Sequence, residues 1–292
     1  MTFQDFKFKE NLQKAIDEAG FKEPSPIQID AIPHILLGKD IVGQAHTGTG
    51  KTAAFGLPVL NQLTGKNAEA VVIVPTRELA MQVSDELFKF GKFLGINTAT
   101  VYGGQAYARQ LKLIETASVI VATPGRFLDL LKNGHIKIKP KFVILDEADE
   151  MLDMGFLDDI KEIFTYLPED RQTLLFSATM PVAIKNLAKT ILKEPEFVTI
   201  TKSDVTNKNI TQTYYVVDER ERDDALIRLF DYKNPKKSII FCRTKKDVDR
   251  LSTFLLSQGF MAKSLHGDME QKQREEAIKA LNCNVDTSDN IL

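Results

Sequence analysis

Six short apolar runs alternate with helix-like stretches between residues 40 and 180, and this alternation constrains the fold more than any other feature of the chain. Runs that are apolar on both faces are typical of a parallel sheet that helices cover on two sides. The sequence therefore predicts an α/β fold with a parallel sheet. The predicted strands are 41–42, 71–74, 98–101, 119–121, 142–145 and 173–176.

Unusual polar clusters follow these runs, each at the carboxyl end of a predicted strand. Because open α/β sheets bind their ligands outside the carboxyl ends of their strands, we expect these clusters to form one composite site. The clusters are Ala45–Thr52, Pro75–Ala80, Gly103–Gly104, Thr123–Arg126, Asp146–Asp149 and Ser177–Thr179.

The first cluster predicts a phosphate-binding loop. Gly48 and Gly50 allow the backbone to curl until several N–H groups point at one spot, and a helix starting there adds the positive end of its dipole. Lys51 can reach outer phosphates, and the Thr52 hydroxyl can ligate magnesium. Ala45 stands at the position where such a loop usually has its first glycine. The plain alternative is an ordinary strand-to-helix turn with a surface lysine.

The acidic cluster Asp146–Asp149 directly follows four consecutive apolar residues. An acidic run is usually a solvated face, but burial at a strand end competes with solvation and predicts a compensating metal. One carboxylate would bind magnesium through water, and the next would orient or deprotonate an attacking water. With Lys51 and Thr52 on a neighbouring strand, the two clusters predict a two-part nucleotide site.

Composition limits the kinds of partner and the cellular compartment that the chain can have. The 38 Lys and Arg residues nearly balance 40 Asp and Glu, so nucleic-acid contacts must come from locally placed groups instead of a basic field. Two cysteines provide neither a disulfide framework nor zinc spacing, which indicates a reducing compartment. Without a signal segment or an apolar run of membrane-spanning length, the chain is predicted to be cytoplasmic and without membrane contact.

A polar, turn-rich stretch over 194–209 predicts an interdomain linker. We therefore expect two domains, 1–204 and 205–292. Before the first strand, helices are predicted over 8–19 and from Ser25 to about residue 38. In the second domain the pattern predicts strands at 213–217, 238–242, 261–265 and 289–292, and helices around 225–230, 246–257 and 270–281.

From about Phe3 to about Ala280 the chain resembles the DEAD-box family of ATP-dependent RNA helicases, within superfamily 2. The letters at 146–149 spell DEAD, and Ala45 is normal in this family's loop. The resemblance implies a RecA-like P-loop domain with a parallel sheet over 1–204, followed by an incomplete second RecA-like domain over 205–292. Matching motifs also occur in order at 20–21 with 24–28, 45–52, 75–80, 103–104, 123–126, 177–179, 240–245 and 266–268 with Gln271 and Arg274.

The resemblance assigns nucleotide-site roles residue by residue. Phe21 would stack on adenine and Gln28 would read its edge. Glu147 would be the general base, assisted in catalysis by Lys51 and Asp146, and Thr52 and Asp146 would hold Mg²⁺ largely through water. The residues expected to bind ATP are Phe21, Gln28, Thr47, Gly48, Thr49, Gly50, Lys51 and Thr52. The alternative for Gln28 is a polar residue at a helix start whose hydrogen bonds are all made within the protein.

The resemblance also assigns coupling and RNA contacts. Asp149, Ser177 and Thr179 would link nucleotide state to domain closure, although Ser177–Thr179 could instead be a helix cap before Pro181. Contacts to the sugar-phosphate backbone would leave little base specificity. The residues expected to bind RNA are Arg77, Gly104, Thr123, Gly125, Arg126, Arg243, Thr244, Gly267, Gln271 and Arg274.

Two motifs of the family's second domain are absent from the 292 residues: the Ala-Thr-Asp motif and the His-Arg-Ile-Gly-Arg-type motif, whose arginines act on the γ-phosphate. Removing an arginine finger costs on the order of 10³–10⁵ in turnover. We therefore expect a C-terminally truncated RNA helicase that binds nucleotide and RNA but is catalytically impaired, whereas the complete protein would unwind short RNA duplexes. The alternatives are a superfamily 2 DNA helicase or translocase, and a non-catalytic nucleotide- or RNA-binding fragment.

Overall fold

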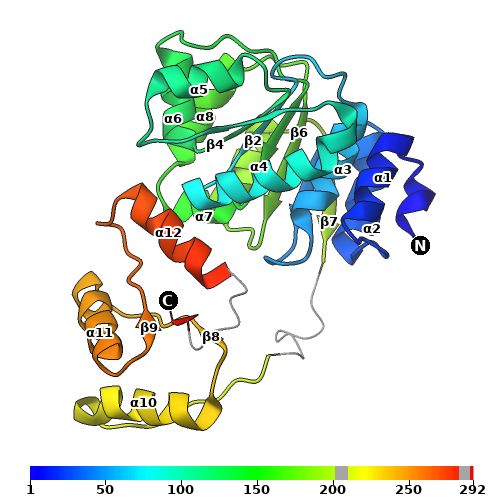
Figure 1. Ribbon diagram of the computed structural model, residues 1–292. Helices are drawn as coiled ribbons and strands as arrows, with labels where there is room; N and C mark the ends of the chain where they lie inside the picture. Colours follow the sequence, from blue (N-terminus) through cyan, green and yellow to red (C-terminus); the bar gives the residue numbers. More distant parts are fainter. Residues whose placement is uncertain (201–209, 283–289, 292) are drawn as a thin grey trace. The chain divides into compact units, whose positions relative to one another are not determined.

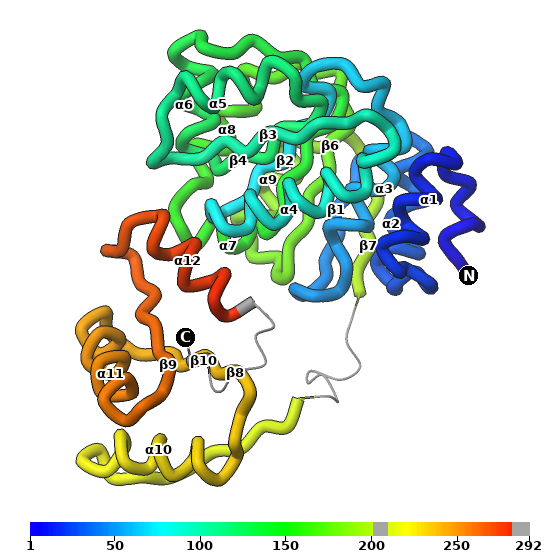
Figure 2. Tube along the Cα trace, in the orientation of Figure 1, coloured from blue at the N-terminus to red at the C-terminus, as the bar shows by residue number. Residues whose placement is uncertain are grey.

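The computed structural model describes residues 1–200, 210–282 and 290–291 (Figures 1 and 2). The chain divides into two compact units, Met1–Val205 and Thr206–Leu292. Within the described residues, no helix is both long enough and apolar enough to cross a lipid bilayer.

The first unit is built on a seven-stranded sheet in the order β3-β4-β2-β5-β6-β1-β7, in which every paired neighbour is parallel. The six predicted apolar runs all form strands, so the α/β class and the parallel sheet are confirmed. The strands are β1 (Ile41–Gln44), β2 (Ala70–Ile73), β3 (Thr98–Val101), β4 (Val119–Ala122), β5 (Phe142–Leu145), β6 (Gln172–Ser177) and β7 (Glu196–Thr199).

Strand β7 corrects the predicted linker, because Glu196–Thr199 falls inside the stretch assigned to it. This strand pairs in parallel with β1 at the sheet edge, where Val198 lies beside Gly43. Only Val198 of its four residues is buried, and the apolar pair Phe197-Val198 stands between the charged residues 194–196 and the polar residues 202–209 that led to the linker prediction. The remainder of the predicted linker, 201–209, lies outside the described residues.

Helices cover both faces of this sheet, since successive residues of a strand point to opposite sides. Ile41 packs into one core and Val42 into the other. The first core is covered by α1 (Glu10–Glu18), α2 (Pro26–Leu36), α3 (Lys51–Gln62) and α4 (Arg77–Gly91), with the 3₁₀ turns Phe3–Phe6 and Lys92–Leu94 (Figure 1). The second core is covered by α5 (Tyr107–Ile114), α6 (Pro124–Lys132), α7 (Ala148–Asp153), α8 (Leu157–Tyr166) and α9 (Val182–Ile191).

The second unit has a three-stranded parallel sheet in the order β8-β10-β9. Its small core consists of Phe230, Leu251, Leu255 and Ala262. The strands are β8 (Lys237–Ser238), β9 (Met261–Ala262) and β10 (Asn290–Ile291), and the helices are α10 (Arg222–Lys233), α11 (Lys245–Ser257) and α12 (Gln271–Asn282), preceded by the 3₁₀ turn Glu219–Glu221.

The second unit departs from the sequence prediction in its strands. The predicted strand 213–217 has no strand structure. The predicted strand 238–242 shares only Ser238 with β8, and the predicted strand 261–265 shrinks to Met261–Ala262. Several apolar side chains of these segments are exposed to solvent, and for Val216 and Phe241 the exposed fraction is 92%. A β-type pattern becomes a strand only where a neighbouring strand pairs with it, and the described residues supply few such neighbours here.

Candidate functional site

A glycine-rich loop joins β1 to α3 at the carboxyl edge of the first sheet. Gly48 and Gly50 take left-handed conformations, with φ of 76° and 86°, which glycine adopts at little cost. Helix α3 begins at Lys51, directly after the second glycine. The loop therefore leads its backbone into a helix N-terminus, where unpaired N–H groups and the helix dipole favour an anion.

Helix α2 braces this loop from the side. The Ser25 hydroxyl donates to the Thr49 carbonyl at 2.7 Å, and Gln28 Nε2 donates to the Gly50 carbonyl at 3.0 Å. Gln28 Oε1 also accepts from the Ser25 backbone N–H at 2.9 Å. A Cβ at position 50 would come within 2.4 Å of Gln28 Nε2, and the φ of 86° there also favours glycine. Gln28 is thus a satisfied helix-start residue and a support for the loop; its contact with adenine stays a prediction.

Lys51 and Asp146 lie together at this edge, both almost fully buried, with 6% and 3% of their surface exposed. Lys51 Nζ is 3.8 Å from Asp146 Oδ1 and has no hydrogen-bond partner. A buried ammonium group without hydrogen bonds is unfavourable unless a ligand supplies them. The structure therefore presents a cation that an anionic ligand would satisfy.

The two acids of this cluster are electrostatically perturbed. Burial raises the pKa of Asp146 to about 6, although nearby Lys51 acts in the opposite direction. Burial also raises the pKa of Glu147, again opposed by Lys51. Glu147 has a left-handed backbone with φ of 55°, a conformation that costs a non-glycine residue on the order of 1–3 kcal/mol. Raised carboxylate pKa values and local strain both occur frequently at functional sites.

The polar groups at this edge fit a magnesium ion that accompanies phosphates. Magnesium usually retains several waters and binds through one or two carboxylates together with substrate phosphates. The Thr52 hydroxyl and the Asp146 carboxylate are oxygen ligands of that kind, and space is open beside Gly48. Within the described part of the chain, no three His, Cys, Asp or Glu side chains are grouped so that they could hold a metal by themselves.

Asp149 ties α7 to the end of β6. Its carboxylate accepts from the Thr179 backbone N–H at 2.8 Å and from the Thr179 hydroxyl at 2.9 Å, and Ser177 Oγ accepts from the Asp149 N–H at 3.2 Å. Burial alone would raise the pKa of Asp149, but hydrogen bonds from Ser177 and Thr179 outweigh it and lower the pKa. The cap preceding α9 is Pro181, so these residues serve as partners of Asp149 and not as a helix cap.

Phe21 stands at the start of the turn that precedes α2. Its ring is partly buried and makes edge contacts with Phe3 and Phe90, at centroid distances of 5.7 and 5.5 Å. These contacts fix the ring on the first core, while its stacking on adenine stays a prediction.

Arg77 and Gly104 are brought together at the same sheet edge. Arg77 begins α4, and its guanidinium lies against the Gly103–Gly104 turn. Gly104 has φ of 88°, and a Cβ added there would come within 2.9 Å of Arg77 Nη1. Glycine therefore allows the predicted RNA-binding arginine to approach this backbone closely.

Thr123, Gly125 and Arg126 lie at the start of α6. Thr123 is the N-cap residue and Gly125 is exposed. Arg126 Nη1 donates at 2.9 Å both to the Gln105 carbonyl and to Gln110 Oε1, and its guanidinium stacks 4.3 Å from the Tyr107 ring centroid. These bonds set the orientation of Arg126 before any ligand binds.

Sequence reasoning missed Glu86 and Gln110. Burial raises the pKa of Glu86 on α4, and the Thr52 hydroxyl acts in the opposite direction. Gln110 is fully buried and donates to the Tyr102 carbonyl at 2.7 Å while holding Arg126. Neither has a sequence signal, because glutamate and glutamine on an amphipathic helix are usually solvated.

In the second unit, the predicted RNA-binding residues lie at the starts of two helices. Thr244 is the N-cap of α11, where its hydroxyl donates to Asp247 Oδ2 at 2.7 Å. Gly267 lies beside Lys245, whose ammonium pairs with Asp268 at 2.5 Å. Gln271 and Arg274 are three positions apart in α12.

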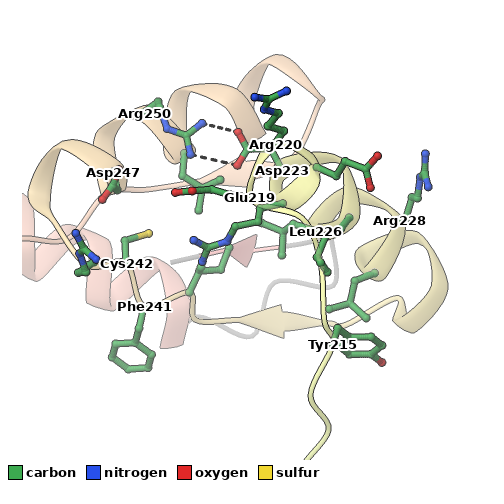
Figure 3. A pocket seen from close by; sticks show the side chains of 18 of the residues that line it. Tyr215, Glu219, Arg220, Asp223, Leu226, Arg228, Phe241, Cys242, Asp247 and Arg250 are labelled. Carbon is green, nitrogen blue, oxygen red and sulfur yellow. Dashed lines mark hydrogen bonds and ion pairs between the residues drawn. The ribbon is translucent and has the colours of Figure 1, made fainter.

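Arg243 lines a cavity of about 1060 Å³ in this unit, together with Cys242 and Phe241 (Figure 3). An ion pair between Asp223 of α10 and Arg250 of α11 lies along its wall, and burial raises the pKa of the Cys242 thiol. The cavity therefore combines an ion pair with exposed apolar side chains.

Comparisons with known proteins agree with the motif order. Residues 25–187 match the family model of the DEAD/DEAH box helicases, and residues 221–292 match that of the helicase conserved C-terminal domain. The chain is 54% identical over 286 residues to the DEAD-box ATP-dependent RNA helicase RhpA of Helicobacter pylori, covering 97% of this chain and 58% of that protein. It is 46% identical to CshA of Bacillus subtilis, covering 96% of this chain and 57% of that protein. The chain thus spans little more than half the length of these curated relatives.

Solved structures of DEAD-box proteins are also similar to this chain. A DEAD box protein from Methanococcus jannaschii matches with 40% identity and a TM-score of 0.66, covering all of this chain and 79% of the other. Saccharomyces cerevisiae Dbp5, in a structure bound to RNA and ADP BeF3, matches with 32% identity and a TM-score of 0.86, covering 99% of this chain and 75% of the other. The fold and the motifs therefore point to the same family.

Proposed function

Because this chain belongs to the DEAD-box helicase family, we propose that its first unit binds ATP with Mg²⁺ and that the chain serves ATP-dependent unwinding of short RNA duplexes. The observation that carries this proposal is Lys51 Nζ, buried 3.8 Å from Asp146 Oδ1 without a hydrogen-bond partner. A triphosphate placed over the glycine-rich loop would supply the missing acceptor. Its other oxygens would meet the backbone N–H groups at the start of α3.

The chain's own residues then have distinct tasks. Lys51 and the loop Thr47–Gly50 hold the phosphates, and Gln28 keeps the loop in its curled form through the Gly50 carbonyl. Glu147, with its raised pKa, is poised to orient and deprotonate a water. Magnesium, held by Thr52 and through water by Asp146, would supply positive charge next to the phosphate oxygens.

Asp149 is proposed to report the state of this site. Its carboxylate holds Thr179, so movement of the segment 146–149 is transmitted to the end of β6. We propose that the units Met1–Val205 and Thr206–Leu292 act as the ATP-binding domain and as part of a second helicase domain.

For RNA, we propose that the residues at the carboxyl edge grip the sugar-phosphate backbone, which gives little base specificity. Support comes from the pre-oriented Arg126 and from Arg77 against Gly104. Both curated relatives described above are named RNA helicases, which favours RNA over the DNA-helicase alternative. We also propose that the 292 residues turn ATP over slowly, since they lack the family's arginine-finger motif.

The test is calorimetric binding of MgATP to the 292-residue chain, together with ATP hydrolysis in the presence of RNA or DNA. Lys51→Ala is expected to weaken MgATP binding by about 100-fold, because it removes a charged hydrogen-bond donor from a buried site. The control is Lys112→Ala, which removes an exposed lysine of α5. Equal affinity of the two variants would overturn the assignment of the nucleotide site. Turnover equal to that of a full-length relative would overturn the proposed impairment.

A further inference from the structure

We infer that Gln110 is a positioning residue for RNA: its side-chain amide joins Arg126 to the turn 102–105, so that both present one preformed surface to the sugar-phosphate backbone. This inference rests on the proposed function and extends it to a residue outside the motifs that the sequence analysis singled out. Gln110 lies on α5, which follows the turn, whereas Arg126 lies in the first turn of α6.

Gln110 occupies a position that an apolar side chain would normally fill. It is fully buried, and with Ile114 it forms the buried face of α5, since residues four apart lie on the same side of a helix. Ile114 packs into the second core. Burying an amide in such a place is unfavourable unless its hydrogen bonds are made. The groups that Gln110 bonds therefore indicate why an amide stands there.

Gln110 and Arg126 together bridge the turn 102–105. Gln110 Nε2 donates to the Tyr102 carbonyl at 2.7 Å, at the start of the turn, and Gln110 Oε1 accepts from Arg126 Nη1 at 2.9 Å. The same Nη1 donates to the Gln105 carbonyl at 2.9 Å, at the end of the turn. Loss of the amide would leave the first carbonyl of the turn without this donor and Arg126 without one of its two acceptors.

The same turn also contacts the second arginine that is predicted to bind RNA. Gly104 lies within the turn, and Arg77 is so close that an added Cβ would be 2.9 Å from its Nη1. Because the position of Gly104 depends on both ends of the turn, Gln110 holds the backbone against which Arg77 packs as well as Arg126 itself.

The bonds that hold Arg126 leave part of its guanidinium for a ligand. A guanidinium has five N–H donors, and the bonds to Gln110 and to the turn use the two on Nη1. The guanidinium stacks on the Tyr107 ring, whose hydroxyl donates to Asp129. Since Arg126 is only half-buried, its Nε and Nη2 hydrogens can serve a phosphate oxygen. A long side chain held in this way loses less conformational entropy on binding, which favours affinity.

The test is the fluorescence anisotropy of a labelled single-stranded oligouridylate with the 292-residue chain, Mg²⁺ and a non-hydrolysable ATP analogue, over a series of KCl concentrations. Gln110→Met keeps the length of the side chain but removes both polar groups, and it is expected to weaken RNA binding about 10-fold. It should also make log affinity less steeply dependent on log salt by about 0.7, the change for one phosphate contact to a single strand. Arg126→Ala should have the same two effects.

Gln172→Met is the matched control, because it removes another buried glutamine whose Nε2 donates to two backbone carbonyls, those of Ile35 and Lys39. Gln172 begins β6, at the opposite edge of the sheet. Both methionine variants should lower the melting temperature, since each leaves buried carbonyls without a donor. Only Gln110→Met should change the RNA affinity and its salt dependence.

Two further variants separate positioning from general damage. In the Arg126→Ala background, Gln110→Met should lose most of its effect on RNA affinity. Arg126→Lys keeps the charge but not the planar group that Gln110 holds, so it is expected to weaken binding nearly as much as Arg126→Ala.

The inference is overturned if Gln110→Met and Gln172→Met bind RNA alike, if the effects of Gln110→Met and Arg126→Ala simply add, or if Arg126→Lys binds as the unsubstituted chain does. In each of these cases the unsubstituted chain still binds RNA and the proposed function stands. If the unsubstituted chain binds MgATP but no RNA, the proposed RNA role itself fails and this inference with it.

Discussion

The two edges of the seven-stranded sheet contain the same ingredients, a buried carboxylate and a lysine, in opposite electrostatic states. At the amino edge, Glu69 precedes β2 and accepts from the Thr64 N–H and hydroxyl, the Lys66 N–H and Lys141 Nζ. Although burial would raise the pKa of Glu69, these bonds lower it to about 2. At the carboxyl edge, burial raises the pKa of Asp146 to about 6 and leaves Lys51 Nζ without a hydrogen bond.

The comparison indicates that polar groups at the amino edge stabilise the fold, whereas those at the carboxyl edge are available for a ligand. Asp40 repeats the amino-edge pattern, since its carboxylate accepts from the backbone N–H groups of Thr173 at 2.8 Å and Lys193 at 2.7 Å. Polar groups at that edge satisfy one another and join loops to strands. Polar groups at the carboxyl edge are held in place by the same strands, but some of them lack hydrogen-bond partners within the protein. A ligand that supplies those partners is bound more favourably.

The largest expected effect tests the carboxyl edge alone. In a protein of the relatives' length, Glu147→Gln should reduce RNA-stimulated ATP hydrolysis by roughly 10²–10⁴-fold, because a general base contributes that much. Nucleotide affinity and thermal stability should change little, as measured by fluorescence titration and calorimetry. Glu150→Gln, an exposed carboxylate of α7, is the control. Similar hydrolysis rates in the two variants would remove Glu147 from the role of base.

The converse substitution tests the amino edge. Glu69→Gln should lower the free energy of unfolding by on the order of 2–3 kcal/mol at pH 7, allowing for the screening of half-exposed Lys141. The pKa of Glu69 falls from 4.5 to about 2 on folding, so this stabilisation is full above pH 4.5 and disappears as the pH falls toward 2. Urea unfolding from pH 7 to pH 3 measures the gap between the two proteins, which should narrow with acid. A gap that widens in acid, or weaker MgATP binding in this variant, would break the distinction between the edges.

The smallest expected effect lies at the Asp149–Thr179 contact. Thr179→Val removes one hydroxyl hydrogen bond to Asp149 and should cost about 0.5–1.5 kcal/mol of stability. Because this contact is proposed to couple the site to RNA, the ratio of ATP hydrolysis with RNA to that without RNA should fall in a protein of the relatives' length. Thr190→Val is the control, since the Thr190 hydroxyl bonds only to carbonyls of its own helix. Unchanged RNA stimulation in Thr179→Val would remove it from coupling.

Sequence patterns predicted the first unit well, for physical reasons visible in particular residues. Strands such as 142–145 are buried on both faces, so their apolar runs appear directly in the sequence. Strand β7 was missed because its apolar pair Phe197-Val198 lies between charged and polar residues, and at the sheet edge only Val198 is buried. In the second unit, 213–217 has a strand pattern but no strand structure, since pairing depends on neighbours that a local pattern does not contain.

The candidate site was predictable in its motifs but not in its supports. Gly48, Lys51 and Asp146 belong to motifs whose spacing reflects their chemistry. Gln110 of α5 holds Arg126 of α6 through a hydrogen bond between helices, which no local pattern records.

Hydrogen exchange on the unsubstituted 292-residue chain, with and without MgATP, compares the two edges most directly. We predict slower exchange of backbone amides in 45–52 and 146–149, with no change around Asp40, in 64–69 or at Lys141. Protection at the amino edge, or none at the carboxyl edge under conditions where the nucleotide binds, would contradict the assignment of the nucleotide to the Lys51–Asp146 cluster.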